Sequence, residues 1–123
     1  MNVTKQQIIN GAVKYIKAEV IDKITDKPLK MTIAAGVSMI ELNPNIADSI
    51  FENDVLSKVL HKNNDGTYDI DIICDIAEKT MNEYGDFPVK IPAIKFISPT
   101  EKELSFGSQD IKRLKEYIGG NAV

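Results

Sequence analysis

A chain of 123 residues that is 43% apolar and 27% charged has the composition of a folded globular protein rather than a disordered one. The formal charge of −3 and the single arginine, Arg113, argue against a protein that coats nucleic acid, which normally needs a basic face. The one cysteine, Cys74, can form no internal disulfide, which fits a reducing cytoplasm.

The chain also lacks membrane and export signals. No apolar run approaches the ~20 residues that cross a bilayer, and the first residues, MNVTKQQIING, lack the apolar core of a signal peptide. Lysine, isoleucine and asparagine are frequent, which suggests a low-GC bacterial or phage genome. We therefore expect one cytoplasmic globular domain over residues 1–123, with no membrane contact and with a frayed tail from about residue 120.

Helical signals begin at once. Thr4 and Gln7 have the spacing of a capping box, in which each side chain bonds the other residue's backbone N–H. Apolar residues then recur every three or four positions, which predicts an amphipathic helix over residues 4–24. A break follows, and Pro28 suits the first turn of a second helix.

Asn43-Pro44 should end this second helix, because the residue before a proline is pushed out of the helical region. Asn43 can then cap a further helical segment. We expect residues 45–60 to form one bent helix or two short ones. The expected buried residues at its start are Ile46, Ile50 and Phe51.

Residues 33–42, IAAGVSMIEL, resemble the turn of a DNA-reading helix-turn-helix, with a Gly-Val-Ser turn and flanking alanines. A recognition helix that began at Ser38 would meet Pro44 after about one and a half turns. Thr32 also stands where a small alanine usually packs. We favour the alternative that Gly36 lets another element approach the second helix closely.

The stretch HKNNDGTYDIDIICD, residues 61–75, holds the only histidine, the only cysteine and four aspartates. Residues 63–66, Asn-Asn-Asp-Gly, form a strong turn signal, and Asp69 can cap a helix that Gly85 ends. The apolar stripe of this helix is expected to comprise Ile70, Ile73, Ala77, Met81 and Tyr84.

The same stretch fails as a metal or catalytic site. If Gly66 held the sixth position of an EF-hand loop, His61 and Ile72 would stand where the loop needs an aspartate and a bidentate glutamate. One histidine and one cysteine are too few for a zinc site, and aspartates beside Cys74 disfavour its thiolate. We predict no metal, cofactor or catalytic residue. The remaining carboxylates, Asp69, Asp71, Asp75 and Glu78, are expected to form a solvated helix face.

Residues 87–106 contain three of the five prolines and alternate apolar with polar side chains, which predicts a β-hairpin with its loop at residues 98–102. Lys90 and Lys95 should point outward, and Phe96 should point inward with the apolar residues. An edge strand with unpaired backbone groups can bind a partner strand. Lys90, Lys95 and Phe96 are therefore the candidate partner-binding edge, although the hairpin can equally serve only to cover the helical core.

Ser108 should cap a last helix that Gly119-Gly120 ends. The fold class is therefore mainly α, or α+β if the hairpin counts: a bundle of four to six helices with a small β-hairpin before the C-terminal helix. The apolar stripes of the helices must share one core.

Three functional hypotheses follow. The first is a non-catalytic protein-interaction or assembly protein, encoded by a phage or mobile element of a low-GC bacterium, whose partner is itself or another protein. The second is a nucleic-acid-associated regulator that uses the degenerate helix-turn-helix or the lysines of the first helix. The third, a small-molecule enzyme, requires a polar-lined pocket. We favour the first, because the chain shows no catalytic cluster and no glycine-rich phosphate loop.

Overall fold

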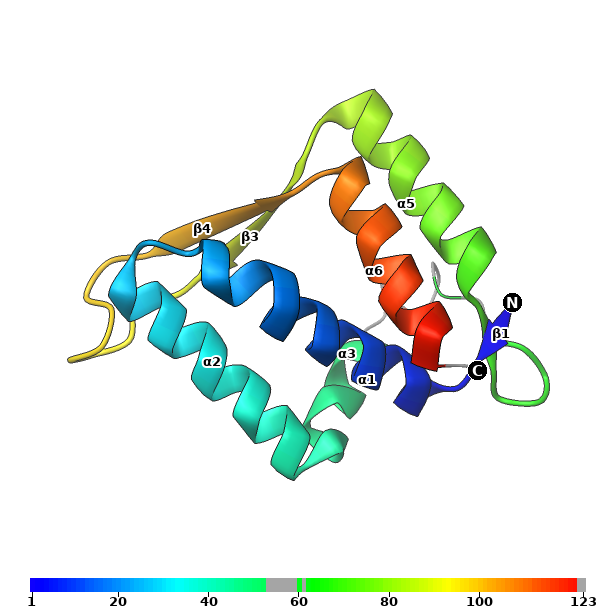
Figure 1. Cartoon of the computed structure of the whole chain (residues 1–123), viewed down its shortest axis with the longest axis horizontal. Helices are drawn as coiled ribbons and strands as arrows, with labels where there is room; N and C mark the ends of the chain where they lie inside the picture. The colour runs from blue at the N-terminus through cyan, green and yellow to red at the C-terminus, as the bar shows by residue number, and fades with distance from the viewer. Residues whose placement is uncertain (53–59, 61, 122–123) are drawn as a thin grey trace.

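The computed structural model describes residues 1–52, 60 and 62–121. The predicted fold class is confirmed: the described chain is mainly α-helical, and a β-hairpin precedes the C-terminal helix (Figure 1). The described strands form two short antiparallel sheets. β1 (Asn2–Val3) pairs with β2 (Tyr68–Asp69), and β3 (Phe87–Ile91) pairs with β4 (Lys102–Phe106). No helix in these described ranges combines the length and the apolar character that a bilayer crossing requires.

The first helix forms as predicted. α1 (Lys5–Tyr15) begins with the expected capping box, in which the Gln7 N–H donates to Thr4 Oγ1 at 3.1 Å and the Thr4 N–H donates to Gln7 Oε1 at 2.7 Å. The helical path continues through a π-helical segment, η1 (Ile16–Val20), and a 3₁₀ turn, η2 (Ile21–Lys23). The change to π-helical hydrogen bonding has no signal in the sequence.

α2 (Lys27–Leu42) is one continuous helix. Asp26 caps it by accepting the Leu29 N–H at 2.9 Å, and proline occupies the first turn as predicted. The helix runs through Gly36 without interruption, as the helical spacing predicts, so residues 33–42 lack the turn that the helix-turn-helix alternative requires. The predicted close approach at Gly36 is wrong, since a Cβ there would meet no atom within 4 Å.

Asn43 ends α2 and caps the following 3₁₀ turn, η3 (Pro44–Ala47), by accepting the Asn45 N–H at 3.3 Å. The short helix α3 (Asp48–Phe51) comes next. The Phe51 ring is half-buried, with its centroid 5.7 Å from that of Tyr68. Ile46 was expected to be buried but is 43% exposed. Whether residues 45–60 hold one helix or two lies partly outside the described residues.

The turn at residues 63–66 is confirmed. The Gly66 N–H donates to the Asn63 carbonyl at 3.0 Å, and Gly66 has a φ of +85°, which glycine adopts without strain. The two-residue strand β2 (Tyr68–Asp69) follows and pairs antiparallel with β1 (Asn2–Val3). The start of the chain is thereby fixed against the segment that leads into the next helix.

α5 (Ile70–Tyr84) begins and ends where the sequence predicts. Asp69 accepts the N–H groups of Asp71 and Ile72 at 3.1 and 3.3 Å, and Gly85, with a φ of +93°, closes the helix. The predicted stripe is wrong at its last position, because Tyr84 is 79% exposed.

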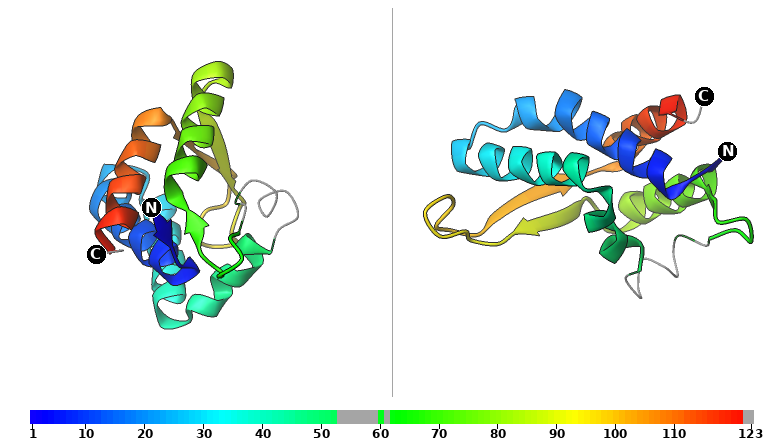
Figure 2. Two further views of the ribbon diagram at one scale, coloured as in Figure 1. Left: turned by 90° about the vertical axis from the view of Figure 1, so that its right-hand side faces the viewer. Right: turned by 90° about the horizontal axis from the view of Figure 1, so that it is seen from below.

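The predicted hairpin is formed by β3 (Phe87–Ile91) and β4 (Lys102–Phe106), which pair antiparallel with Val89 opposite Leu104. It runs from the end of α5 and the start of α6 toward the N-terminal end of α2 (Figures 1 and 2). The predicted loop at residues 98–102 is confirmed in part, because the connection between the strands covers residues 92–101 and only Lys102 belongs to β4. The connection starts earlier than predicted and turns at residues 94–98, where Ile94 and Ser98 form an isolated β-bridge.

α6 (Ser108–Asn121) is longer than predicted at its C-terminal end and starts one residue earlier than a Ser108 cap would give. Gly107 is the cap, because its carbonyl accepts the first helical bond and its N–H donates to Asp110 Oδ2 at 2.8 Å. The predicted stop at Gly119-Gly120 is wrong. A Cβ at Gly119 would lie 3.2 Å from Met1 Cε, so this glycine serves packing instead.

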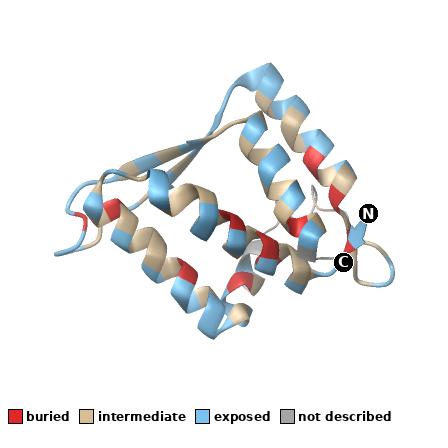
Figure 3. Cartoon of the chain, in the orientation of Figure 1, coloured by how far each residue is buried: buried red, intermediate tan, exposed pale blue. Residues whose placement is uncertain are grey.

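The core lies where α1, α5 and α6 meet the N-terminal strand. The buried cluster consists of Val3, Ile70, Cys74 and Ile118, each at most 4% exposed. Figure 3 shows buried positions on α1, α5 and α6 at this end of the molecule, and further ones on α2 and in the hairpin turn. Gly11 of α1 is buried against α6, and a Cβ there would lie 2.5 Å from the Ile118 Cα. α1 and α6 can therefore cross this closely only because residue 11 has no side chain.

Two glycine variants test this crossing. We expect Gly11→Ala to destabilise the fold by about 1–3 kcal/mol, because the new methyl group meets the α6 backbone, which cannot move aside as a side chain could. Gly36→Ala is the matched control in a helix interior with open space, and should stabilise by about 0.5–1 kcal/mol through helix propensity alone. Urea unfolding measures both free energies, and a Gly11→Ala variant as stable as Gly36→Ala would contradict the close crossing.

Candidate interaction surface

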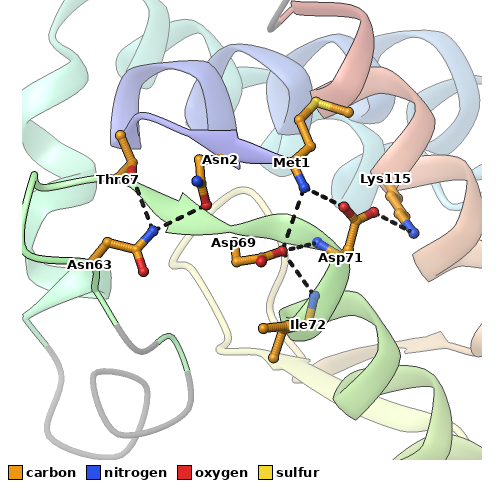
Figure 4. A network of polar contacts seen from close by, with 8 residues as sticks. All are labelled: Met1, Asn2, Asn63, Thr67, Asp69, Asp71, Ile72 and Lys115. Atoms are coloured by element: carbon orange, nitrogen blue, oxygen red, sulfur yellow. Dashed lines mark hydrogen bonds and ion pairs between the residues drawn. The ribbon is translucent and has the colours of Figure 1, made fainter.

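The acidic residues at the start of α5 form an ion-pair network with the N-terminus and α6 (Figure 4). The α-amino group of Met1 donates to Asp71 Oδ2 and lies 3.6 Å from Asp69 Oδ1. The Lys115 ammonium pairs with the other oxygen of Asp71 at 2.9 Å. Both carboxylates also lie at the N-terminal end of α5, where the helix dipole favours negative charge. Their geometry is accounted for by structural contacts.

The electrostatics of Asp71 follow from this network. Hydrogen bonds from the N-terminal amine and from Lys115 lower the pKa of the Asp71 carboxyl to about 2. The same contact with Asp71 raises the pKa of the Met1 amine. The remainder of the predicted acidic face is mixed: Asp75 is exposed, whereas Glu78 is half-buried with one buried oxygen that has no partner among the described atoms.

Cys74 is a core residue. It is 4% exposed, and burial is the main cause that raises the pKa of its thiol to about 11. The thiol is therefore protonated at neutral pH, which is the unreactive form. His61, the other half of the cysteine–histidine pair considered above, lies outside the described residues. Within the described ranges, no group of three or more histidine, cysteine, aspartate or glutamate side chains could hold a metal ion.

The hairpin tip presents an aromatic ring to solvent. Phe96 was predicted to point inward, but it is 92% exposed and has a φ of +70°. The ammonium of the neighbouring Lys95 lies 5.1 Å from the centroid of this ring. Lys95 and Lys90 are both exposed as predicted. The structure thus brings Lys95 and Phe96 together at the tip, while Lys90 lies back in β3 opposite Glu103.

A tight base supports this exposed tip. Ser98 is 1% exposed, and its backbone exchanges two hydrogen bonds with Ile94, at 2.7 and 2.9 Å. The Ser98 hydroxyl also donates to the Thr100 carbonyl at 3.1 Å. Because these bonds fix the turn on both sides of residue 96, the ring is held outward by an ordered loop.

The hairpin is joined to the helical layer at one side. Lys102, the first residue of β4, pairs with Asp26 at the start of α2 across 2.8 Å. Between β4 and the η1–η2–α2 corner lies a groove of about 320 Å³, with Leu29 and Leu104 among its apolar lining. In the described chain, β3 and β4 form a sheet of two strands, so the outer edge of each has no strand beside it. An open edge of this kind can pair with an extended segment of another protein.

A second, larger groove of about 680 Å³ runs between α1 and the C-terminal end of α2. Its apolar floor includes Ile9, Val13 and Ile40, and its rim carries Lys17 and Glu41, which pair at 3.3 Å. Polar side chains, Gln6 and Asn10 among them, join this pair in the otherwise apolar lining, so the small-molecule hypothesis stays untested.

Sequence reasoning missed one surface. The outer face of α2 leaves Met31 and Met39 more than half exposed and Leu42 87% exposed. The signal was available in the composition of the helix, which carries only three charged residues, Lys27, Lys30 and Glu41, among sixteen. A helix that is apolar on all sides is typical of a buried helix, yet α2 lies at the outside of the helical layer (Figure 1).

Neither a family model, nor a curated protein, nor a solved structure matches this chain.

The Met1–Asp71–Lys115 network predicts a pH-dependent contribution to stability. Because the pKa of Asp71 is lowered, its contribution is fully present above pH 3.8, the ordinary value, and is lost as the pH falls toward 2. We expect Asp71→Asn to unfold at lower urea concentration than the wild type at pH 6, and the difference to become much smaller as the pH falls to 2, where about half of the Asp71 carboxyls of the folded protein are protonated. Asp75→Asn is the control on the same helix. A difference that persisted undiminished at pH 2 would contradict the ion-pair explanation.

Proposed function

We propose that this chain is a non-catalytic protein-interaction or assembly protein of the cytoplasm, and that the hairpin tip around Lys95 and Phe96 binds a partner protein. The observation that carries the proposal is Phe96, a bulky aromatic residue that is 92% exposed and held at a φ of +70°. The genomic setting, a phage or mobile element of a low-GC bacterium, is part of the same proposal and rests on composition alone.

Folding does not explain the residue type at position 96. The left-handed backbone region costs an L-residue about 1–2 kcal/mol, and a turn of this kind favours glycine or asparagine. The phenylalanine ring recovers none of this cost through burial, since almost all of it faces solvent. A residue that is unfavourable for the turn and unused by the core points to a role in recognition.

The chemistry of the tip suits a protein partner. Aromatic side chains are enriched among the few residues that dominate the energy of protein interfaces. The lysine beside the ring adds a positive charge that can select an acidic rim around an apolar pocket. The open edges of the hairpin offer backbone hydrogen bonds to an extended segment of the same partner, so the tip and the edge can act together.

The nucleic-acid alternative is less well supported. α2 is a continuous helix through residues 33–42, so the helix-turn-helix geometry is missing from that segment. Two lysines of the first helical segment already pair with carboxylates, Lys5 with Asp48 and Lys17 with Glu41. Neutralised lysines contribute little to the phosphate contacts on which nucleic-acid affinity depends.

Site-specific photo-crosslinking tests the proposed partner contact. We expect a photoreactive phenylalanine analogue at position 96 to give one dominant crosslinked protein in cells that carry the gene. The same analogue in place of Tyr84, which is 79% exposed but lies at the end of α5, should not crosslink to that protein. Equal crosslinking from both positions, or none from position 96, would contradict a binding site at the tip.

The variant Phe96→Gly separates folding from binding. Glycine relieves the left-handed backbone, so the free energy of unfolding should be unchanged or higher by up to about 1 kcal/mol. Binding to the crosslinked partner, measured by calorimetry, should weaken at least tenfold because the aromatic anchor is gone. Phe106→Ala, at a half-buried position of β4, should show the reverse pattern: the free energy of unfolding falls, and the folded variant keeps its affinity for the partner. Full affinity in Phe96→Gly would exclude the ring as the anchor.

A further inference from the structure

A second surface carries an inference that does not depend on the hairpin. On the outer side of α2, exposed residues recur at intervals of four, four and three, which places them on one helix face. We call these residues the α2 stripe. They are Met31, Ala35, Met39 and Leu42.

We propose that the α2 stripe is a self-association face, on which α2 of a second copy of this chain packs antiparallel. The inward face of the same helix is already used, since Leu29 and Val37 are buried. The stripe is a separate apolar face, and unbranched methionines are well suited to fill the gaps of a helix–helix contact.

The charges of α2 favour this occupant. Lys27 and Lys30 stand at its N-terminal end, and its first turn contains no acidic residue. Glu41 stands at the C-terminal end, and its last turn contains no basic residue. These positions oppose the preference of the helix dipole, which favours negative charge at the N-terminus and positive charge at the C-terminus. Within the chain, the Asp26 carboxylate caps the N-terminal end and Lys17 pairs with Glu41 at the C-terminal end. An antiparallel second copy would add a further opposite charge at each end, because it places its own Glu41 near the exposed Lys27.

The spacing of the charges agrees with this arrangement. Lys27 and Glu41 are fourteen positions apart on the sequence, close to four helical turns, so both lie on the same flank of the stripe. A two-fold axis that relates antiparallel helices brings the same flank of each helix together. Lys27 of each copy then faces Glu41 of the other, whereas in a parallel pair Lys27 and Glu41 would lie at opposite ends of the pair and could not meet.

The centre of the stripe permits a close approach. Ala35 and the neighbouring exposed Ser38 are small, so two helices can pack at the 8–10 Å separation of ordinary helix pairs. The larger Met31 and Met39 lie on either side of this centre, so Met31 of one copy packs opposite Met39 of the other. α2 spans sixteen residues, or about 24 Å, which is short for a permanent interface. We therefore expect a reversible dimer.

Sedimentation velocity on the intact chain, from about 1 to about 500 μM, is the test. We expect the 13.7 kDa monomer to give way to twice that mass as the concentration rises. Met39→Glu should weaken association at least tenfold. Ile72→Glu, at a residue of α5 that is 53% exposed against 56% for Met39, should associate as the wild type does. A wild type that stays monomeric throughout, or an Ile72→Glu variant that alone loses association, would overturn the proposal.

Charge reversal tests the antiparallel orientation. Lys27→Glu and Glu41→Lys should each weaken self-association, because each creates two like-charge contacts in the pair. An equimolar mixture of the two variants should recover association, since both contacts then join opposite charges. Lys17→Gln removes the ion pair of Glu41 within the chain and should leave association unchanged. A mixture that associates no better than its components would exclude this arrangement.

Substitutions at the hairpin tip separate this proposal from the proposed partner binding. Phe96→Gly should leave the sedimentation profile unchanged, because the tip lies outside the α2 stripe. Met39→Glu should likewise retain the crosslink from position 96. Loss of self-association in Phe96→Gly would place the self-contact at the hairpin and overturn the α2 stripe.

Discussion

The close crossing of α1 and α6 is the constraint on which the rest of the structure depends. It joins the first and last helices of the chain, and it requires Gly11, because any side chain there would meet the α6 backbone at Ile118. β1 then lies beside the segment before α5, and Val3 is fully buried in the same cluster as Ile70. The core is therefore built from both ends of the sequence, and the segments between them are arranged around it.

The position of this core decides which surfaces are left open. α6 packs between α1 and α5, whereas α2 lies on the far side of α1 (Figures 1 and 3). The hairpin tip extends beyond the N-terminal end of α2 (Figure 1). α2 buries Leu29 and Val37, and among the described residues no second layer covers its outer face. Both surfaces that we interpret as functional thus belong to elements that the core does not need to enclose.

Local signals predicted the fold, and long-range packing decided the rest. Thr4, Asp69 and Gly85 each act through backbone groups only a few residues away, so their roles can be read from the sequence. The pattern of Gly119 predicted a helix end, but α6 continues past it and the Met1 side chain packs against it. Only the tertiary structure places Met1 there. The exposure of Lys90 and Lys95 was predicted correctly. The orientation of Phe96 was not, because it depends on a turn whose position no local pattern fixed.

The two proposed surfaces have a geometric consequence when they are combined. The hairpin tip lies beyond the N-terminal end of α2 (Figure 1 and the right-hand view of Figure 2). The Lys102–Asp26 ion pair joins the hairpin to that end of the helix. In an antiparallel pair of α2 helices the two N-terminal ends point in opposite directions, so the two tips would project from opposite ends of the dimer. They could not both contact one small partner. They could instead bind two copies of a partner, or two repeats of a larger assembly, where the second contact gains from the effective concentration that the first provides.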